Sequence, residues 1–182
     1  MTEATLTAEH RRSLLEVARS AIRARVAGEK PSPSPELPEL QARGGAFVSL
    51  HRRDTRELRG CVGFVEAEFV VVETVARAAR AVCGDRRFPP VTLEELPDLY
   101  VEISLLGALE PIAPEDVELG VHGLVLRHRG RSGLLLPQVP VELDWDRQTF
   151  LDHTCVKAGL PAGSWSHPDA ELLGFTATVF GE

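Results

Sequence analysis

The sequence has few cysteines and no long apolar run. Its three cysteines, Cys61, Cys83 and Cys155, are an odd number without CxxC spacing. This pattern argues against a disulfide framework and favours a reducing, cytoplasmic location. We expect no membrane association, because Glu73 interrupts the apolar stretch 69–72 long before it reaches the length of a membrane span. The first residues are acidic and precede an amphipathic pattern, so no secretory signal is predicted.

Motifs for several large enzyme classes are also missing. The sequence contains no GxxxxGK[ST] loop, no GxGxxG after a strand, no HExxH and no GxSxG. Its six histidines are far apart and no pair has metal-ligand spacing, so we expect neither a metal nor a cofactor. The net charge of −7 argues against the broad basic surface that nucleic acids require, and we expect no nucleic-acid binding.

The composition and the apolar periodicity predict a globular α+β domain. The chain has 182 residues, of which 43% are hydrophobic and 26% charged. Helical spacing of apolar residues predicts helices at Thr7–Val26, at Glu68–Cys83 and from Asp144 or Asp146 to Ala158. Alternation predicts strands at Ala46–His51, Leu58–Phe64, Leu99–Leu105, Val121–His128, Gly133–Val139 and Leu173–Val179.

These elements imply a mostly antiparallel sheet flanked by helices, in which the N- and C-terminal parts join. Four prolines make residues 31–42 an extended surface connection. We treat residues 1–182 as one domain. Two prolines break the pattern at Gly107–Pro114, and we place a smaller β-rich subdomain within 108–145.

The most unusual stretch is the strand Leu58–Phe64. Its alternation puts Leu58, Val62 and Phe64 on a core face and Arg59 beside Cys61 on the other face, about 6–7 Å apart. The two glycines that flank the cysteine, Gly60 and Gly63, suggest a bulge or the close approach of a ligand or another backbone.

Two interpretations of Cys61 remain open at this point. A neighbouring arginine favours the thiolate, which is the reactive form. A small buried cysteine in a tight strand is the alternative, because free cysteine is among the most buried residue types. The adjoining turn, with Arg52, Arg53 and Arg56, is either a solvated loop or a lip that attracts anions towards Cys61.

The hexapeptide Leu-Arg-Gly-Cys-Val-Gly resembles that of the AMMECR family, whose bacterial and archaeal members are called protein A of the AmmeMemoRadiSam system. Further segments match in the same order: 85–90, 94–97, 120–123, 135–139, 145–146 and 157–159. The resemblance implies a larger part that holds both termini, a smaller part, and a cleft between them near the hexapeptide. It also implies a shared pathway with a Memo-like protein and a radical-SAM enzyme.

Two hypotheses of function follow. In the first, the protein is an enzyme or enzyme component that uses Cys61 on a small anionic or acyl-bearing substrate. His122, which lies in a matched family segment, is then the candidate base. The candidate binding residues are Arg59, Gly60, Gly63, Asp85 and Arg86, with Arg87 as an alternative source of charge. In the second hypothesis, the protein is a non-catalytic partner or scaffold, and the hexapeptide strand is a docking element.

Overall fold

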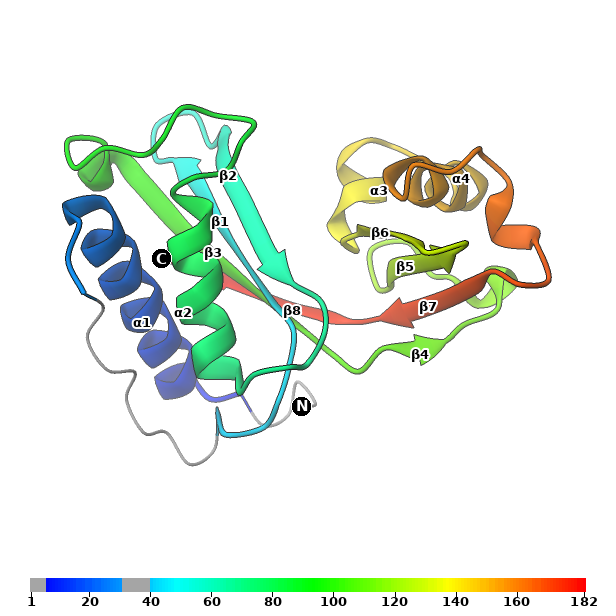
Figure 1. The fold of residues 1–182 in the computed structure, drawn as a ribbon, viewed down its shortest axis with the longest axis horizontal. Coiled ribbons are helices and arrows are strands. Elements are labelled where there is room, and N and C mark those ends of the chain that lie inside the picture. Colours follow the sequence, from blue (N-terminus) through cyan, green and yellow to red (C-terminus); the bar gives the residue numbers. More distant parts are fainter. Residues whose placement is uncertain (1–5, 31–39) are drawn as a thin grey trace. The chain divides into compact units, whose positions relative to one another are not determined.

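The computed structural model describes residues 6–30 and 40–182, so most of the predicted connection 31–42 lies outside the described residues. The chain divides into two compact units (Figure 1). The first consists of Met1–Leu106 together with Thr178–Glu182, and the second of Gly107–Ala177. The second unit therefore extends beyond the predicted range 108–145. The cleft expected between the two parts stays a prediction.

The first unit is a four-stranded sheet covered on one face by two helices that lie side by side (Figure 1). The strand order is β2-β1-β3-β8. The strands are β1 (Ala46–Arg52), β2 (Leu58–Phe64), β3 (Leu99–Leu106) and β8 (Ala177–Gly181). The helices are α1 (Ala8–Ala27) and α2 (Val71–Val82), and a short 3-10 helix, η3 (Leu96–Asp98), precedes β3. The N- and C-terminal parts thus join in one sheet, as predicted.

Local sequence signals explain the first helix and the first strand. The Thr7 side chain accepts a hydrogen bond from the His10 N–H and forms a capping box, while Gly28 ends α1 with φ +72°. In β1, alternate side chains from Ala46 to Leu50 are fully buried in the core against the helices. Phe47 and Ser49 consequently belong to the opposite sheet face.

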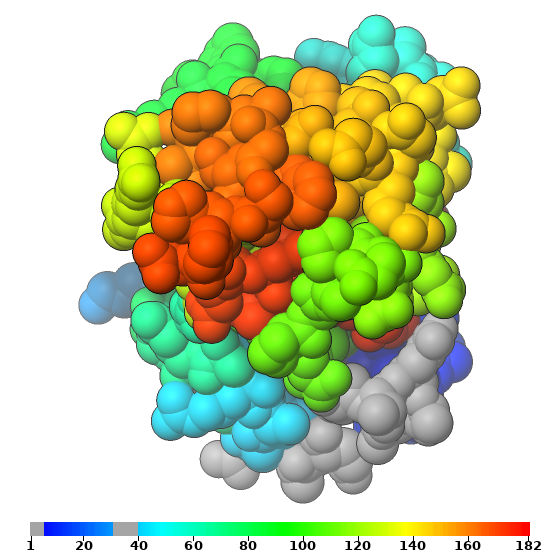
Figure 2. Space-filling view, turned by 90° about the vertical axis from the view of Figure 1, so that its right-hand side faces the viewer, coloured from blue at the N-terminus to red at the C-terminus, as the bar shows by residue number. Residues whose placement is uncertain are grey.

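The second unit is a four-stranded sheet in the order β4-β7-β5-β6 with two further helices. Its strands are β4 (Glu110–Pro111), β5 (Gly123–His128), β6 (Arg131–Leu135) and β7 (Glu171–Phe175). The helices α3 (Gln138–Glu142) and α4 (Arg147–Lys157) form adjacent parts of one face of this unit (Figure 2). Short 3-10 helices, η4 (Pro114–Asp116) and η5 (Ser164–Ser166), lie in its loops. Asp146 caps α4 by accepting from the Thr149 N–H, which decides between the two predicted caps.

Three predicted strands of the second half differ from the structure. Val121–His128 begins only at Gly123, so His122 lies in the preceding turn. Gly133–Val139 is strand only to Leu135, after which the chain turns into α3. Leu173–Val179 is not one strand but parts of β7 and β8, which belong to different sheets. No helix among the described residues is long and apolar enough to cross a membrane.

Candidate functional site

The strand β2 carries the hexapeptide at the outer edge of the first sheet. Its pairing with β1 shifts between Leu50 and His51, where Gly60 and Leu58 are the successive partners. Arg59 is therefore an extra residue in a β-bulge, which reverses the alternation at this end of the strand. The expected core position of Leu58 is wrong, since this residue is 39% exposed, whereas Arg59 is only 6% exposed.

Both glycines of the hexapeptide allow a close approach, and in each case it is the protein itself that approaches. A Cβ at Gly60 would lie 3.2 Å from the carbonyl oxygen of Val82, at the end of α2. A Cβ at Gly63 would lie 2.3 Å from the ring of Phe47, which faces it across the two strands. The predicted bulge and the predicted approach of another backbone both occur at β2.

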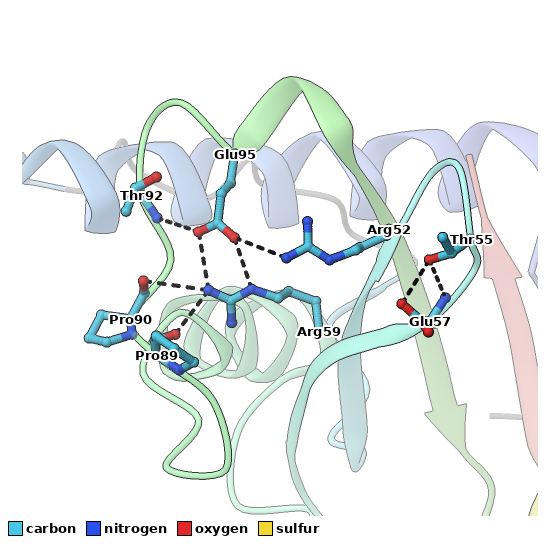
Figure 3. Close-up of polar contacts among 8 residues, drawn as sticks. All are labelled: Arg52, Thr55, Glu57, Arg59, Pro89, Pro90, Thr92 and Glu95. Atoms are coloured by element: carbon cyan, nitrogen blue, oxygen red, sulfur yellow. Dashed lines mark hydrogen bonds and ion pairs between the residues drawn. The ribbon is translucent and has the colours of Figure 1, made fainter.

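The Arg59 side chain points towards the loop that follows α2 and is held there by hydrogen bonds (Figure 3). Its Nε and Nη2 donate to the two carboxylate oxygens of Glu95 at 3.0 and 3.1 Å, a bidentate pair. Nη2 also donates to the carbonyl of Pro89 at 2.9 Å. Arg52 approaches the same Glu95 carboxylate at 3.7 Å. The Arg59 pairing holds the pKa of Glu95 below its usual value, so this arginine is occupied by a carboxylate of the fold.

The other arginines of the β1–β2 turn also have partners. Arg53 pairs with the Glu182 carboxylate, and the Arg56 guanidinium lies 4.7 Å from the centre of the Tyr100 ring. Residues 52–57 are all exposed, so the turn is solvated, although its arginines contact other residues of the fold. Near Arg59 it borders an open cavity of about 590 Å³, whose lining includes Arg52, Leu58, Phe88 and Pro90.

The backbone of Cys61 is clamped by two charged side chains. Its N–H donates to Asp85 Oδ2 at 3.0 Å, and its carbonyl accepts from Arg87 Nη2 at 3.2 Å. Arg87 and Asp85 also pair with each other at 2.7 Å. Because β2 is an edge strand, these side chains replace the hydrogen bonds that a further strand would make. The Arg87 hydrogen bonds hold the pKa of Asp85 well below its usual range, and Asp85 raises the pKa of Arg87.

Cys61 is partly exposed as a residue, whereas Cys83 and Cys155 are buried. Burial nevertheless raises the pKa of the Cys61 thiol, and this effect exceeds the opposing hydrogen bond from Ser49 and the charge of Arg87. The expectation that Arg59 lowers this pKa is wrong. The bulge explains the difference, because it turns Arg59 towards Glu95 instead of along the face of the thiol.

Sequence reasoning missed three polar residues that share the sheet face with Cys61. Strand register places Cys61 opposite Ser49 and Ser49 opposite Glu102, so the three form a row across β2, β1 and β3. His51 lies two residues beyond Ser49 on the same face. Its Nε2 is 3.8 Å from Glu102 Oε1. Alternation in β1 could have indicated Ser49 and His51, but the Glu102 contact depends on register.

The tautomer of His51 follows from its second contact. Nδ1 lies 3.2 Å from the carbonyl oxygen of Arg56, which can only accept a hydrogen bond, so Nδ1 carries the proton. In the neutral ring the basic nitrogen is therefore Nε2, which faces Glu102. Cys61, Ser49, Glu102 and His51 consequently combine a thiol, a hydroxyl and two proton acceptors on one sheet face.

The remaining predicted site residues lie elsewhere or lack contacts. His122 belongs to the second unit, where its Nδ1 accepts from the Glu118 N–H at 3.0 Å, and its pairing with Cys61 stays a prediction. Arg86 is exposed, and no hydrogen bond or ion pair joins it to another described residue. Arg87, the alternative source of charge, is the arginine that contacts Cys61. Across residues 6–30 and 40–182, no group of three or more His, Cys, Asp or Glu side chains could hold a metal ion.

Comparisons with known proteins give matches over nearly the whole chain. The family model AMMECR1 matches residues 15–180. Protein MK0488 of Methanopyrus kandleri is 43% identical over 187 residues, which cover 97% of this chain and 90% of that protein. The crystal structure of the uncharacterized protein PH0010 from Pyrococcus horikoshii is similar with a TM-score of 0.88 and 41% identity, and the match covers 93% of this chain and 89% of that one.

Proposed function

This chain belongs to the AMMECR1 family, and from this premise we propose that it is a cysteine-dependent enzyme or enzyme component acting on a small anionic or acyl-bearing substrate. The observation that carries the proposal is the setting of Cys61. It is the one cysteine of the three that is not buried, and its backbone is fixed by Asp85 and Arg87. A fixed backbone holds a reacting sulfur in a defined position.

The chemistry needs a base, because a thiol whose pKa is raised is protonated at neutral pH. Glu102 and His51 are on the same sheet face and can accept that proton. The proton leaves Sγ for the base, the sulfur forms a bond to the acyl carbon, and the leaving group departs with the proton. The acyl group is then transferred from Cys61 to a second nucleophile or to water.

The pathway part of the proposal rests on the family. Memo-like and radical-SAM proteins of the AmmeMemoRadiSam system are the partners that we propose, in the reducing cytoplasm that three free cysteines favour. The substrate is a small molecule rather than a nucleic acid, in keeping with the net charge of −7.

A second candidate function is favoured by one specific observation. The raised pKa of Cys61 is what a packing residue has, and Arg59 is occupied by Glu95. In this alternative the protein is a non-catalytic partner, and β2 is the docking element. The exposed Leu58 at the start of this edge strand is then the side chain that a partner covers.

An acylation assay separates the two functions. The full chain is incubated with p-nitrophenyl acetate, and acetylated peptides are identified by mass spectrometry. The enzyme proposal expects acetylation of Cys61 ahead of Cys83 and Cys155, its loss in Cys61→Ser, and a rate reduced about tenfold or more in His51→Gln or Glu102→Gln. Cys83→Ser is the matched control and retains the reaction. Acetylation of Cys61 no faster than that of a free thiol of the same pKa rejects catalysis and leaves the docking function.

A further inference from the structure

A second cavity lies in the first unit, away from the hexapeptide. It has a volume of about 260 Å³ and is lined by residues of α1, β1, η3 and β3, together with Arg53 and Glu182. Its apolar lining includes Ile22, Leu50, Leu99 and Val101, and its charged lining consists of Arg19, Arg23, Arg53 and Glu182. This combination differs from the hexapeptide cavity, where two arginines are matched by two glutamates.

Burial divides the cavity into a floor and a mouth. Ile22, Leu50 and Val101 are at most 5% exposed, so the apolar side chains lie in the core of the unit. The side chains of Arg19 and Arg53 are 49% and 48% exposed, which places them towards solvent. A hollow with an apolar floor and a few convergent polar groups is the usual form of a small-molecule site.

The mouth already holds one carboxylate, that of Glu182. Arg19 Nε donates to its Oε1 at 2.7 Å, and Arg53 Nη2 donates to its Oε2. Although this side chain is only 12% exposed and burial alone would raise its pKa, the two arginines lower the pKa of Glu182 below its usual value. The two guanidinium groups are therefore spaced to hold one carboxylate between them.

The arginine side chains at the mouth outnumber the one carboxylate side chain, that of Glu182. Three arginines line the cavity against one glutamate. Arg23 makes no hydrogen bond or ion pair with another described residue. A neighbouring hollow of about 340 Å³ shares Arg19 and Arg23. Its two further charged residues, Lys30 and Glu29, have opposite signs, so its excess positive charge is again that of the two arginines.

We propose that this cavity binds a small organic acid with an apolar body, whose carboxylate replaces that of Glu182 between Arg19 and Arg53. The apolar body contacts Ile22, Leu99 and Val101. Binding is in competition with Glu182, which is part of the chain and therefore present at a high effective concentration. The site is separate from the Cys61 chemistry and does not depend on it.

Hexanoate is a suitable probe. Acetate is the control that lacks the apolar body, and 1-hexanol is the control that lacks the charge. The full chain is labelled at its isoleucine methyl groups and titrated by NMR. The sequence has only three isoleucines, Ile22 in the cavity, Ile103 on β3 and Ile112 in the second unit. We expect hexanoate to shift the Ile22 signal saturably and leave Ile112 unchanged. Acetate and 1-hexanol should each bind about tenfold more weakly or worse.

Three variants test the geometry. Arg53→Gln and Arg19→Gln should each weaken hexanoate binding about tenfold, because each removes a charged hydrogen bond. Arg77→Gln, which removes an equally exposed arginine that pairs with Glu73 on α2, should leave binding unchanged. Glu182→Gln removes the internal competitor and should tighten binding about threefold or more. The two arginine substitutions are on the surface, and Glu182→Gln leaves both arginines in place. The test therefore does not depend on a single substitution that could unfold the protein.

The proposal is overturned if hexanoate causes no saturable shift of Ile22, or if acetate or 1-hexanol binds as tightly. It is also overturned if Arg53→Gln and Arg77→Gln have equal effects, since the attraction is then only that of net charge. Weaker binding in Glu182→Gln would show that this carboxylate belongs to the site rather than competes for it.

Discussion

The carboxylate of Asp85 lies 3.0 Å from the backbone nitrogen of Cys61, and Arg87 completes the contact by donating to the carbonyl of the same residue. A residue of the loop after α2 thus closes the exposed edge of the first sheet. An unprotected edge strand is a template for pairing with other chains. The Asp85–Arg87 pair therefore links the stability of β2 to the ionisation of one carboxyl group.

Stability at low pH should depend on Asp85. Its folded-state pKa is depressed by Arg87, so its contribution is fully present above the unfolded value of about 3.9 and is lost as the pH falls below it. We expect Asp85→Asn to lose about 1–3 kcal/mol of unfolding free energy at pH 7 and to flatten the decline between about pH 4 and 2. Urea unfolding followed by circular dichroism at several pH values measures both effects. An unchanged pH profile in Asp85→Asn would assign the acid sensitivity to other carboxylates.

The buried Arg59 should make Glu95 one of the more sensitive positions in the first unit. Glu95→Gln leaves a 7% exposed guanidinium without its carboxylate, and we expect a loss of about 2–4 kcal/mol. The double variant Arg59→Met with Glu95→Gln should recover part of this loss, because no unpaired charge remains. Denaturant unfolding of the two single variants and the double variant gives the coupling energy. If the losses of unfolding free energy in the two single variants add up to the loss in the double variant, the ion pair contributes no coupling energy.

The close approach at Gly63 predicts a steric effect. Gly63→Ala places a Cβ 2.3 Å from the Phe47 ring, and we expect a loss of about 1–3 kcal/mol. Phe47→Leu in the same chain should reduce that loss by making room. Gly84→Ala is the control, since its new Cβ would meet nothing closer than 3.9 Å. The midpoints of thermal unfolding measure these effects. Equal midpoints for Gly63→Ala and Gly84→Ala would mean that β2 accommodates the new methyl group without a loss of stability.

Local sequence signals were sufficient to predict an element where the partners of its residues are close in sequence. Helix α1 begins after Thr7, whose side chain caps it together with His10, and ends at Gly28. Apolar alternation located β1 and β2 to within one residue. The ion pair Glu73–Arg77 on α2, at 2.7 Å, is likewise local, since the two residues have i,i+4 spacing. In each of these cases the contacts lie within one element or one turn.

The errors at Arg59 and at the C-terminal strand share a physical cause, since each depends on strand pairing or on a second sheet. Alternation cannot reveal a bulge, so Arg59 was placed beside the thiol instead of against Glu95. It also cannot distinguish one long strand from two, and β7 and β8 were merged although Thr176 separates strands of different sheets. The row of Cys61, Ser49 and Glu102 was out of reach because it joins three strands through their register.

The last prediction concerns the second unit, where Trp165 lies in η5, between α4 and β7. Its indole Nε1 donates to Asp152 Oδ1 at 2.9 Å, and the same carboxylate oxygen accepts from the Gly163 N–H at 2.8 Å. Asp152 on α4 thus ties the 163–165 segment at two points. Trp165→Phe keeps most of the apolar surface but removes one hydrogen bond, so we expect a loss of about 1–2 kcal/mol.

Asp152→Ala removes both hydrogen bonds and should therefore be the more damaging change, by about 1 kcal/mol or more beyond Trp165→Phe. Hydrogen exchange of the Gly163 amide adds a local readout. It should accelerate in Asp152→Ala and stay slower in Trp165→Phe, because only the former removes its acceptor. If Trp165→Phe is the more destabilising variant, the ring's packing against the core of the second unit, rather than the hydrogen bond to Asp152, holds this loop in place.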